Sequence, residues 1–472
     1  MVMGDLPVET DMVVVGGGPG GYAAAFRAAD SGLDVMLVSD ESRLGGVCLL
    51  RGCIPSKTLL SLTELVLAAR DAESFGVGFG DPEIDIDRLL EWKQDVIEGM
   101  ARGLQALCKR RGVQVIEARA RLTGTDELYL EDSDDHRIKF GHAVLATGSR
   151  PTPLPGTEFG GRVMDSRRAL ELESVPDRLL VVGGGYVGLE LGMVYSVLGS
   201  EVSLVEMTDR LLPQTDPDLV EPLSARVDDL FQDVQLETRV EAIEETEEGV
   251  TVNFSGDGGE SERYDAVLIA IGRQPNVEDL GLEDAGVELD DDGYIAVDDE
   301  RRTSVESIFA IGDVAGGKML AHEAMREGRV AAEVIAGEPA AFDVRAVPAV
   351  VYTDPQIAWC GLTEREAEET NREIEVARFP WRASGRAASI DATDGLTKVI
   401  VDPETEQVLG VGIVGPQAEA LIAEGVLAVE MGAVAADLAL IVHPHPTLTE
   451  TLGEAAQLLL GGATHFYPRK RD

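Results

Sequence analysis

MVVVGGGPGG, residues 12–21, is an apolar run that ends in a glycine-rich turn. Residues 22–30 then follow a helical pattern, and DVMLV at 34–38 reads as a second strand. Strand, turn, helix and strand in this order, with Gly16, Gly18 and Gly21 in the turn, are typical of a dinucleotide-binding unit. The glycines allow a pyrophosphate to approach the backbone, and the helix N-terminus then faces the phosphates.

The same plan returns in LLVVGGGYVG, residues 179–188, followed by EVSLV at 201–205. A single GxGxxG is weak evidence, but two copies placed between a strand and a helix are a strong signal. Such units place an acid about 20 residues further on to hold the ribose hydroxyls. Glu206 fills that place in the second copy and favours NAD over NADP, whereas Ser39 and Asp40 stand there in the first copy.

Shorter segments return the chain between the domains. AVLATGSRP (143–151) and VLIAIGRQPN (267–276) each run from a strand into a glycine turn, and SIFAIGDVAGG (307–317) places Asp313 at a strand's carboxyl end. We therefore expect an α/β fold with two duplicated Rossmann-like dinucleotide-binding domains and an α+β C-terminal domain. The expected domains are 1–150 and 276–344 for the first nucleotide, 151–275 for the second, and 345–472 for the C-terminal domain.

Composition limits the class of partner. The chain has 472 residues, with 86 acidic against 40 basic side chains and a net charge of −46, which repels nucleic acid and anionic membranes. The acids are dispersed among apolar segments, which argues against a disordered acidic tail and indicates a hydrated surface suited to a halophile. Neither a signal peptide nor a run of about 18 apolar residues is recognisable, so we expect a cytoplasmic protein.

GGVCLLRGCIPSK, residues 45–57, holds two cysteines five residues apart. Zinc is disfavoured because Cys108 and Cys360 stand alone, so no metal site is predicted. In a regular helix the two cysteines would be about 7.5 Å apart along the axis, so a disulfide needs a bend, which Gly52 supplies. Cys53 would begin the next helix, where the helix dipole and nearby Lys57 favour a thiolate. The pair reads as a redox device.

The duplicated glycine turns, this cysteine motif, "ATG", "GD" and HPHPTLTE at 443–450 together resemble the pyridine nucleotide–disulfide oxidoreductases. The resemblance extends from residue 10 to about 460, and within the family it is greatest to the dihydrolipoamide dehydrogenases. It implies FAD and NAD as cofactors. The implied FAD-site residues are Gly16, Gly18, Gly21, Ser39, Asp40, Gly46, Lys57, Ala120, Thr147, Gly148, Ser149, Asp313, Met319, Leu320, Ala321 and His322. The implied NAD-site residues are Gly183, Gly185, Tyr186, Gly188, Glu206, Val240 and Gly272.

The resemblance also implies a division of catalytic labour. Cys53 would contact the flavin and Cys48 would exchange with substrate sulfur. Further catalytic residues would be Lys57 paired with Glu190, and His445 as a base oriented by Glu450. Because the family's histidine serves the other subunit, a homodimer is expected, with the domain 345–472 at its interface. Lipoyl domains of 2-oxoacid dehydrogenase complexes are the expected partners.

The implied reaction is oxidation of dihydrolipoamide with reduction of NAD⁺. Leu50, Arg51 and Tyr186 depart from the usual pattern, and Tyr186 resembles the gating tyrosine of glutathione reductases. The alternatives are therefore a reductase of a small disulfide, which Glu206 disfavours because such enzymes use NADPH, and a non-catalytic flavoprotein scaffold. A scaffold has no need for the cysteine pair and the histidine motif together.

Overall fold

The computed structural model describes residues 8–80, 82–131, 137–255 and 261–467. The chain divides into two compact units. Unit 1 is drawn from Met1–Thr58, Glu83–Thr152 and Gly272–Asp343, and unit 2 from Leu59–Pro82, Pro153–Ile271 and Val344–Asp472. One helix, α3 (Cys53–Asp71), crosses the boundary between them.

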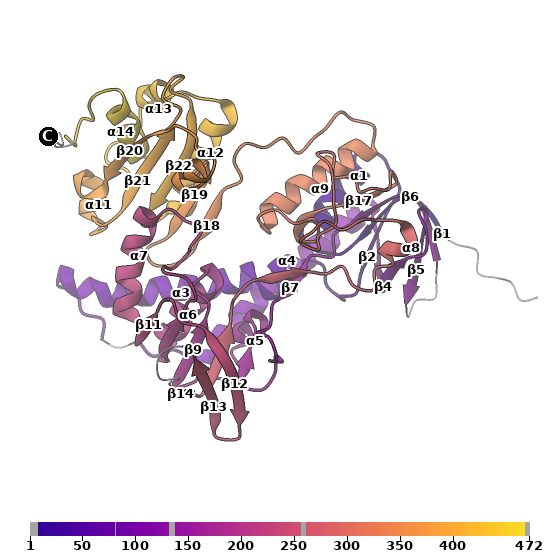
Figure 1. Ribbon diagram of the computed structural model, residues 1–472, viewed down its shortest axis with the longest axis horizontal. Helices are drawn as coiled ribbons and strands as arrows, with labels where there is room; N and C mark the ends of the chain where they lie inside the picture. Colours follow the sequence, from indigo (N-terminus) through magenta and orange to yellow (C-terminus); the bar gives the residue numbers. More distant parts are fainter. Residues whose placement is uncertain (1–7, 81, 132–136, 256–260, 468–472) are drawn as a thin grey trace, which may run out of the picture. The chain divides into compact units, whose positions relative to one another are not determined.

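Unit 1 is built on a seven-stranded sheet (Figure 1). Its strands are β1 (Val8–Val15), β2 (Val35–Ser39), β3 (Gln114–Glu117), β4 (Arg119–Leu122), β5 (Glu127–Glu131), β6 (Arg137–Leu145) and β17 (Ile308–Ala310). β3, β2, β1, β6 and β17 are paired in parallel, while β5 and β4 continue from β6 as antiparallel strands. The apolar run 12–15 is buried because β1 lies in the middle of this sheet, which explains why it lacks alternation.

Helices cover the sheet of unit 1. They are α1 (Pro19–Asp30), α2 (Gly46–Arg51), α4 (Ile86–Arg111), α8 (Leu282–Ala285), α9 (Ala321–Ile335) and the 3-10 turn η2 (Gly312–Ala315). α1 and α9 lie side by side although about 300 residues separate them in the sequence (Figure 1). A small antiparallel pair, β7 (Ser149–Pro151) and β16 (Arg273–Pro275), joins the second and third segments of this unit.

The first part of unit 2 repeats the parallel architecture. Its sheet, in the order β11-β10-β9-β15-β8, consists of β8 (Val163–Met164), β9 (Arg178–Val182), β10 (Glu201–Val205), β11 (Asp233–Gln235) and β15 (Ala266–Ile269). An antiparallel sheet adds β12 (Val240–Thr246), β13 (Gly249–Phe254) and β14 (Ser261–Tyr264). The helical segments are η1 (Ala72–Phe75), α5 (Ser166–Glu171), α6 (Tyr186–Leu198) and α7 (Pro217–Leu230).

The C-terminal part of unit 2 is α+β. Its antiparallel sheet runs β18 (Ala349–Val351), β19 (Ile357–Gly361), β22 (Val408–Val414), β21 (Leu396–Val401) and β20 (Glu375–Pro380). Its helical segments are α10 (Glu364–Glu369), η3 (Trp381–Ala383), α11 (Gly385–Ser389), α12 (Ala418–Met431), α13 (Ala435–Leu440) and α14 (Glu450–Leu459). α12 packs on β19 and β22, and α14 packs on β20 and β21, around a core that contains fully buried Trp381. The predicted fold class is confirmed.

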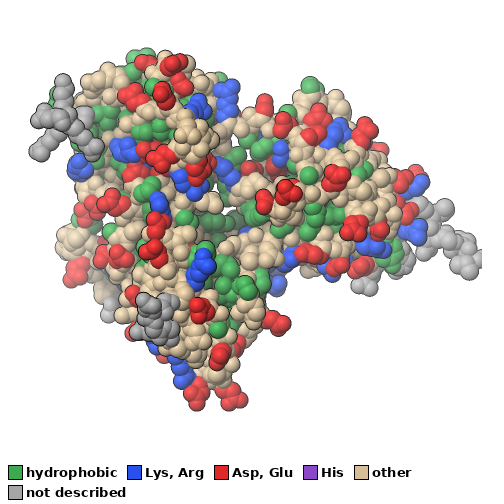
Figure 2. All heavy atoms as spheres, viewed as in Figure 1, with side chains coloured by type: hydrophobic (Ala, Val, Ile, Leu, Met, Phe, Trp, Pro, Cys, Tyr) green, Lys and Arg blue, Asp and Glu red, His purple; other side chains and the backbone are tan. Residues whose placement is uncertain are grey.

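Acidic side chains are scattered over the visible face of both units, with arginines and lysines between them (Figure 2). The expected dispersed acidity is therefore a surface property of folded domains. No helix in the described residues has the length and apolar character needed to cross a membrane.

Candidate functional site

The first glycine turn joins β1 to α1 and is closely packed. A Cβ placed on Gly16, which has φ +116°, would lie 2.2 Å from the carbonyl oxygen of Ala146. A Cβ on Gly21 would lie 1.9 Å from the carbonyl oxygen of Gly16, so neither position tolerates a side chain. Gly18 caps α1 without a side-chain hydrogen bond, which leaves the first backbone N–H groups of the helix available to an anion.

Ser39 and Gly46 lie against this turn. A Cβ on Gly46 would come within 2.6 Å of the Cα of Gly18, and a Cβ on Gly17 within 3.1 Å of the Ser39 hydroxyl. Ser39 is buried at the end of β2, and its Oγ accepts a hydrogen bond of 3.3 Å from the backbone N–H of Glu41. Asp40, the alternative ribose ligand, is exposed. The structure thus places the hydroxyl, rather than the carboxylate, beside the glycines.

Asp313 lies in η2, directly after β17, and takes part in a network that the sequence did not reveal. The Ser149 hydroxyl donates to Asp313 Oδ2, while Arg273 donates through Nε to Ser149 Oγ and through Nη2 to the Ser149 carbonyl, both at 2.7 Å. Arg273 Nε lies 3.9 Å from Asp313 Oδ2. Arg273 therefore fixes the Ser149–Asp313 pair at the carboxyl end of the sheet.

Thr147 is held by a second residue that sequence reasoning missed. Its hydroxyl donates to the carbonyl of Asn276 at 2.8 Å, and the Asn276 side-chain amide donates to the Thr147 carbonyl at 2.9 Å. Arg273 and Asn276 both belong to the GRQPN segment, which the sequence analysis read only as a return between domains. The sequence did offer one signal. GRQPN follows an apolar run in VLIAIGRQPN in the same way as GSRP follows one in AVLATGSRP.

The other residues expected around FAD lie on three elements of unit 1. Ala120 is buried in β4, and Gly148 precedes β7 with φ +71°. Met319 has φ +54° just before α9, Leu320 is the N-cap residue of that helix, and Ala321 and His322 are its first two residues.

The cysteines lie on two consecutive helices. Cys48 is in α2, and Cys53 is the first residue of α3. Gly52 separates the helices with φ −143° and ψ −108°, and a Cβ there would lie 2.8 Å from the Val47 carbonyl oxygen. The predicted bend and the position of Cys53 at a helix start are confirmed. No disulfide joins Cys48 and Cys53 in the structure, which therefore represents the reduced form of the pair.

The two thiols interact with each other and with charged neighbours in unit 1. A hydrogen bond with Cys53, followed by burial, raises the pKa of the Cys48 thiol, while the charge of Lys57 acts in the opposite direction. Burial, together with both cysteines, raises the pKa of Tyr22. Asp313 also acts on Cys48. The raised pKa favours the protonated form of the Cys48 thiol, and Cys53 lies at the start of α3, where a helix dipole stabilises negative charge.

Arg51 lies between the cysteines but forms an ion pair with Glu41. Its side chain is about one-third exposed at the end of α2. The positive charge that Arg51 brings to the cysteine segment is thus largely compensated by this carboxylate.

The second glycine turn, between β9 and α6, repeats the geometry of the first. A Cβ on Gly183, which has φ +110°, would lie 2.5 Å from the Ala270 carbonyl oxygen, and one on Gly188 would lie 2.1 Å from the Gly183 carbonyl oxygen. Gly185 caps α6 without a side-chain hydrogen bond. Tyr186 is the first residue of that helix and is 40% exposed.

Glu206 follows β10 and is held by the loop beside it. Its Oε2 accepts from the Gly184 N–H at 2.7 Å, and its Oε1 accepts from the backbone N–H and the hydroxyl of Thr208 at 2.8 and 2.9 Å. The carboxylate is buried and fixed next to the glycine turn. Of the other residues expected around NAD, Val240 begins β12 in unit 2, and Gly272, with φ +136°, belongs to unit 1.

Glu190 and His445 both lie in unit 2. Glu190 is buried in α6, where its Oε1 accepts from the Tyr352 N–H at 3.0 Å. His445 follows α13 and is 69% exposed, and its Nδ1 lies 2.9 Å from Glu450 Oε1. The Nε2 edge of the ring is thereby left for a proton-transfer partner.

Glu450 is well prepared to orient the imidazole. Its second oxygen accepts from the Thr447 N–H at 2.7 Å. Although partial burial acts in the other direction, this N–H and the His445 ring hold the pKa of Glu450 below its usual value. An ionised carboxylate on Nδ1 selects the tautomer in which Nε2 accepts a proton.

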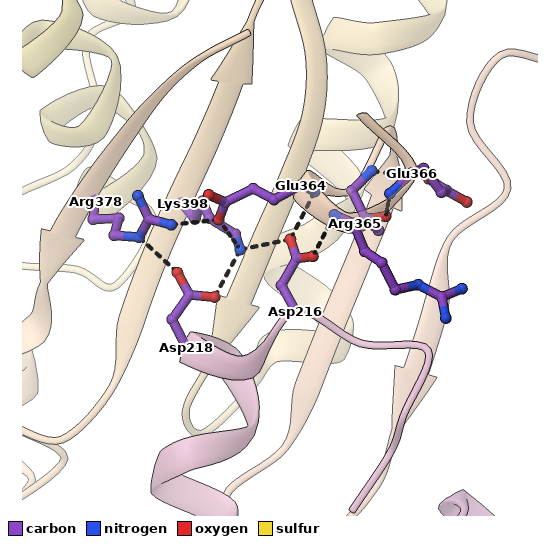
Figure 3. A network of polar contacts seen from close by, with 8 residues as sticks. Asp216, Asp218, Glu364, Arg365, Glu366, Arg378 and Lys398 are labelled. Atoms are coloured by element: carbon purple, nitrogen blue, oxygen red, sulfur yellow. Dashed lines mark hydrogen bonds and ion pairs between the residues drawn. The ribbon is translucent and has the colours of Figure 1, made fainter. Parts of the chain in front are cut away.

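A separate cluster brings carboxylate oxygens of Asp216, Asp218 and Glu364 within 4.8 Å of one another (Figure 3). Such a cluster resembles a cation site, but the ammonium of Lys398 lies among the three, at 2.6, 2.7 and 2.8 Å. Lys398 is only 1% exposed, and Arg378 also pairs with Asp218 and Glu364. This lysine supplies the positive charge that a metal would otherwise bring.

Comparison with known proteins identifies the arrangement. Residues 10–328 match the family described as pyridine nucleotide-disulphide oxidoreductase, and residues 347–456 match the dimerisation domain of that family. Dihydrolipoyl dehydrogenase from Vibrio parahaemolyticus is 46% identical over 98% of both chains. Dihydrolipoyl dehydrogenase from the halophile Halobacterium salinarum is 45% identical over 99% of this chain and 100% of its own.

Solved structures agree. LpdA from Mycobacterium tuberculosis has a TM-score of 0.88 at 29% identity, covering 95% of this chain and 99% of its own. The HOCl-induced flavoprotein disulfide reductase RclA from Escherichia coli, in a Cu(II) complex, has a TM-score of 0.84 at 26% identity, covering 95% and 100%.

Proposed function

Because the chain belongs to the pyridine nucleotide–disulphide oxidoreductase family, we propose that it oxidises dihydrolipoamide to lipoamide and reduces NAD⁺ to NADH. It is an oxidoreductase that uses FAD and NAD, and the resemblance stated from the motifs is confirmed. The observation that carries the proposal is the group of Cys48, Cys53, Lys57 and Asp313 in unit 1, where two thiols share a hydrogen bond beside the expected flavin acid.

The cysteines supply the thiol chemistry. With the pair oxidised, a dihydrolipoamide thiolate attacks Cys48 and forms a mixed disulfide, which releases the Cys53 thiolate. The second substrate thiol then attacks the substrate sulfur that is bonded to Cys48. This forms the disulfide of lipoamide, breaks the bond to Cys48 and leaves the cysteine pair reduced, as in the structure. The hydrogen bond with Cys53, which raises the pKa of Cys48, favours the proton on Cys48.

The first glycine turn, with Ser39, Gly46 and the Ser149–Asp313 pair, fits FAD. The positions where a Cβ would collide with backbone are those where a pyrophosphate needs close approach. FAD held by these residues would supply the electron carrier between the dithiol and NAD⁺, which would be reduced by hydride. Lys57 would place positive charge beside the flavin, and we propose that Glu190 is its partner.

The second glycine turn fits NAD. Glu206 would exchange its hydrogen bond from Gly184 for the ribose hydroxyls, and its charge repels a 2′-phosphate. The proposed domain roles follow from the two turns: residues 1–150 and 276–344 hold FAD, 151–275 hold NAD, and 345–472 form the interface.

The C-terminal domain makes the chain a homodimer. Its apolar face agrees with that role, because Met431, Leu440 and Val442 are 75%, 79% and 94% exposed in the single chain. We propose that His445 takes the substrate proton at the cysteine pair of the partner subunit, while Glu450 holds its ring. The proposed partners are lipoyl domains of 2-oxoacid dehydrogenase complexes, and the proposed location is the cytoplasm.

Steady-state rates in molar salt test the function. NAD⁺ reduction by dihydrolipoamide should be fast, and NADPH oxidation by glutathione disulfide should be negligible. The reverse result would assign a small soluble disulfide as substrate and make Tyr186 a gate for NADPH. Cys53→Ser should abolish thiol turnover while FAD stays bound; full turnover in this variant would exclude the cysteine mechanism.

A further inference from the structure

A second histidine lies against His445. The rings of His445 and His465 are nearly parallel, with 9° between their planes and 6.4 Å between their centroids. His465 lies on the segment that follows α14, 20 residues beyond His445, and the motif analysis gave it no role.

His465 is paired in the same way as His445. Its Nδ1 lies 2.7 Å from Glu454 Oε1, and its backbone N–H donates to Glu454 Oε2 at 3.2 Å. Glu454 is buried and stands four residues after Glu450, so the two carboxylates occupy one face of α14 a turn apart. One helix therefore supplies a carboxylate to each of the two stacked rings.

The segment that carries His465 is anchored on both sides of the ring. Phe466 meets buried Phe379 edge-on at 6.3 Å between centroids, and the Arg382 guanidinium lies 5.8 Å from the Phe466 ring centre. The Thr464 hydroxyl donates to the Gln457 side chain at 3.3 Å. These contacts fix the place of His465 independently of its bond to Glu454.

We propose that His465 is a positioning residue for His445, holding the plane of the base and balancing the buried Glu454 charge beside it. This inference rests on the proposed function for its catalytic meaning. Glu450 and Glu454 of α14 are the carboxylates that face the two rings, and each imidazole also faces the other one. Arg382 of η3 lies on the neighbouring Phe466 ring.

The physical reason is the charge that Glu454 leaves near the base. His465 pairs with this carboxylate through Nδ1 at 2.7 Å, which offsets part of its negative charge. Without His465, the negative charge of Glu454 would stabilise the protonated form of His445. Release of the proton taken from substrate would then be slower. The pairing of His465 with Glu454 thus limits the charge that this carboxylate exerts on the base.

Titration of the histidines by NMR tests this in the FAD-loaded dimer, because the chain has only six histidines to assign. In His465→Gln the midpoint of His445 should rise by about 0.5 pH unit. The double variant His465→Gln/Glu454→Gln, which removes both charges, should return the midpoint most of the way. Thr464→Val, which weakens the same segment without changing charge, is the matched control and should leave the midpoint in place.

Turnover gives the second readout. The acidic limb of kcat/KM for dihydrolipoamide should move by the same amount in His465→Gln, a loss of about 3-fold on that limb. NADH oxidation by an artificial electron acceptor does not use the base and should stay unchanged. An unmoved His445 midpoint overturns the inference even if dihydrolipoamide turnover is high. Absent dihydrolipoamide turnover in the wild-type protein overturns the proposed function instead, and the titration still decides the role of His465.

Discussion

The two glycine turns share a backbone and differ in the group that follows the second strand. In unit 1, Cβ atoms on Gly16 and Gly21 would collide at 2.2 and 1.9 Å, and in unit 2 those on Gly183 and Gly188 would collide at 2.5 and 2.1 Å. Both helices start on a glycine without a side-chain cap. The backbone of the two turns, where we propose that the pyrophosphates bind, is therefore equivalent.

The two sites differ at the residue that we propose faces the ribose of each cofactor. Glu206 is a buried carboxylate that accepts three hydrogen bonds from Gly184 and Thr208, whereas Ser39 accepts one longer bond from Glu41. A cofactor that leaves in every cycle needs a strong recognition group. When the cofactor is absent, water or loop N–H groups must form the hydrogen bonds of that group. A cofactor that stays bound depends on many weaker contacts spread over unit 1. The difference teaches that recognition strength at one position follows the residence time of the ligand.

Alanine at the third glycine should break the two sites separately. Gly21→Ala should prevent FAD binding and abolish all turnover, because its Cβ would lie 1.9 Å from a backbone oxygen. Gly188→Ala should keep the yellow FAD-bound protein while kcat/KM for NAD⁺ falls about 100-fold. Flavin absorbance per chain and NAD⁺ kinetics are the measurements.

Gly185→Ala is the matched control, since no atom lies within 4 Å of its Cβ. It should fold and retain FAD, so any loss of NAD⁺ affinity reports the approach of the ligand itself. Loss of FAD from Gly188→Ala would contradict the separate assignment of the turns.

A buried carboxylate of unit 1, Glu327 in α9, should make stability depend on pH. Burial raises the pKa of Glu327 to about 7, although the Gly312 N–H and Arg301 act against it. The folded protein then binds more protons than the unfolded one between about pH 4.5 and 7, so this group's contribution falls as pH rises through that window. Glu327→Gln should therefore gain about 3 kcal/mol relative to wild type between pH 4.5 and pH 8.

Flavin release on chemical denaturation at the two pH values measures this difference, because the other carboxylates cancel between the variants. An equal stability difference at both pH values would assign the stability change with pH to other groups.

Glu206→Ser copies the first site into the second. The loss of a charge-assisted hydrogen bond should lower kcat/KM for NAD⁺ about 20-fold and improve the ratio of NADP⁺ to NAD⁺. Rates with both nucleotides test this, with Thr208→Val as a control that removes one partner of the carboxylate but keeps its charge. An unchanged nucleotide ratio would remove Glu206 from nucleotide selection.

Ser39→Ala should have the smallest effect. Its hydroxyl makes a neutral hydrogen bond of 3.3 Å, so FAD affinity should fall by less than about 5-fold. Fluorescence titration of FAD into apoprotein measures the affinity. A loss as large as that of Glu206→Ser would mean that the two ribose sides are equally demanding.

The sequence predicted features that depend on local geometry. The glycine turns, the bend at Gly52 and Cys53 at a helix start follow from spacing within a few residues. Arg273 and Asn276 were missed because they act on Ser149 and Thr147 from more than 120 residues away. His465 was missed for a related reason. It belongs to no motif in the sequence, and only the packing of the segment after α14 places its ring against His445. The neutralisation of Arg51 by Glu41 likewise depends on tertiary structure.

The ammonium among Asp216, Asp218 and Glu364 joins the start of α7 to β21 and α10 within unit 2. In a chain with 40 basic residues and 86 acidic ones, most negative charge must be met by ions from solution. Lys398 is a counterion tethered by the peptide chain, so mass action does not empty its place. Neither dilution nor a chelator removes this ammonium. The link between α7, α10 and β21 therefore keeps its cation at high and at low salt concentration.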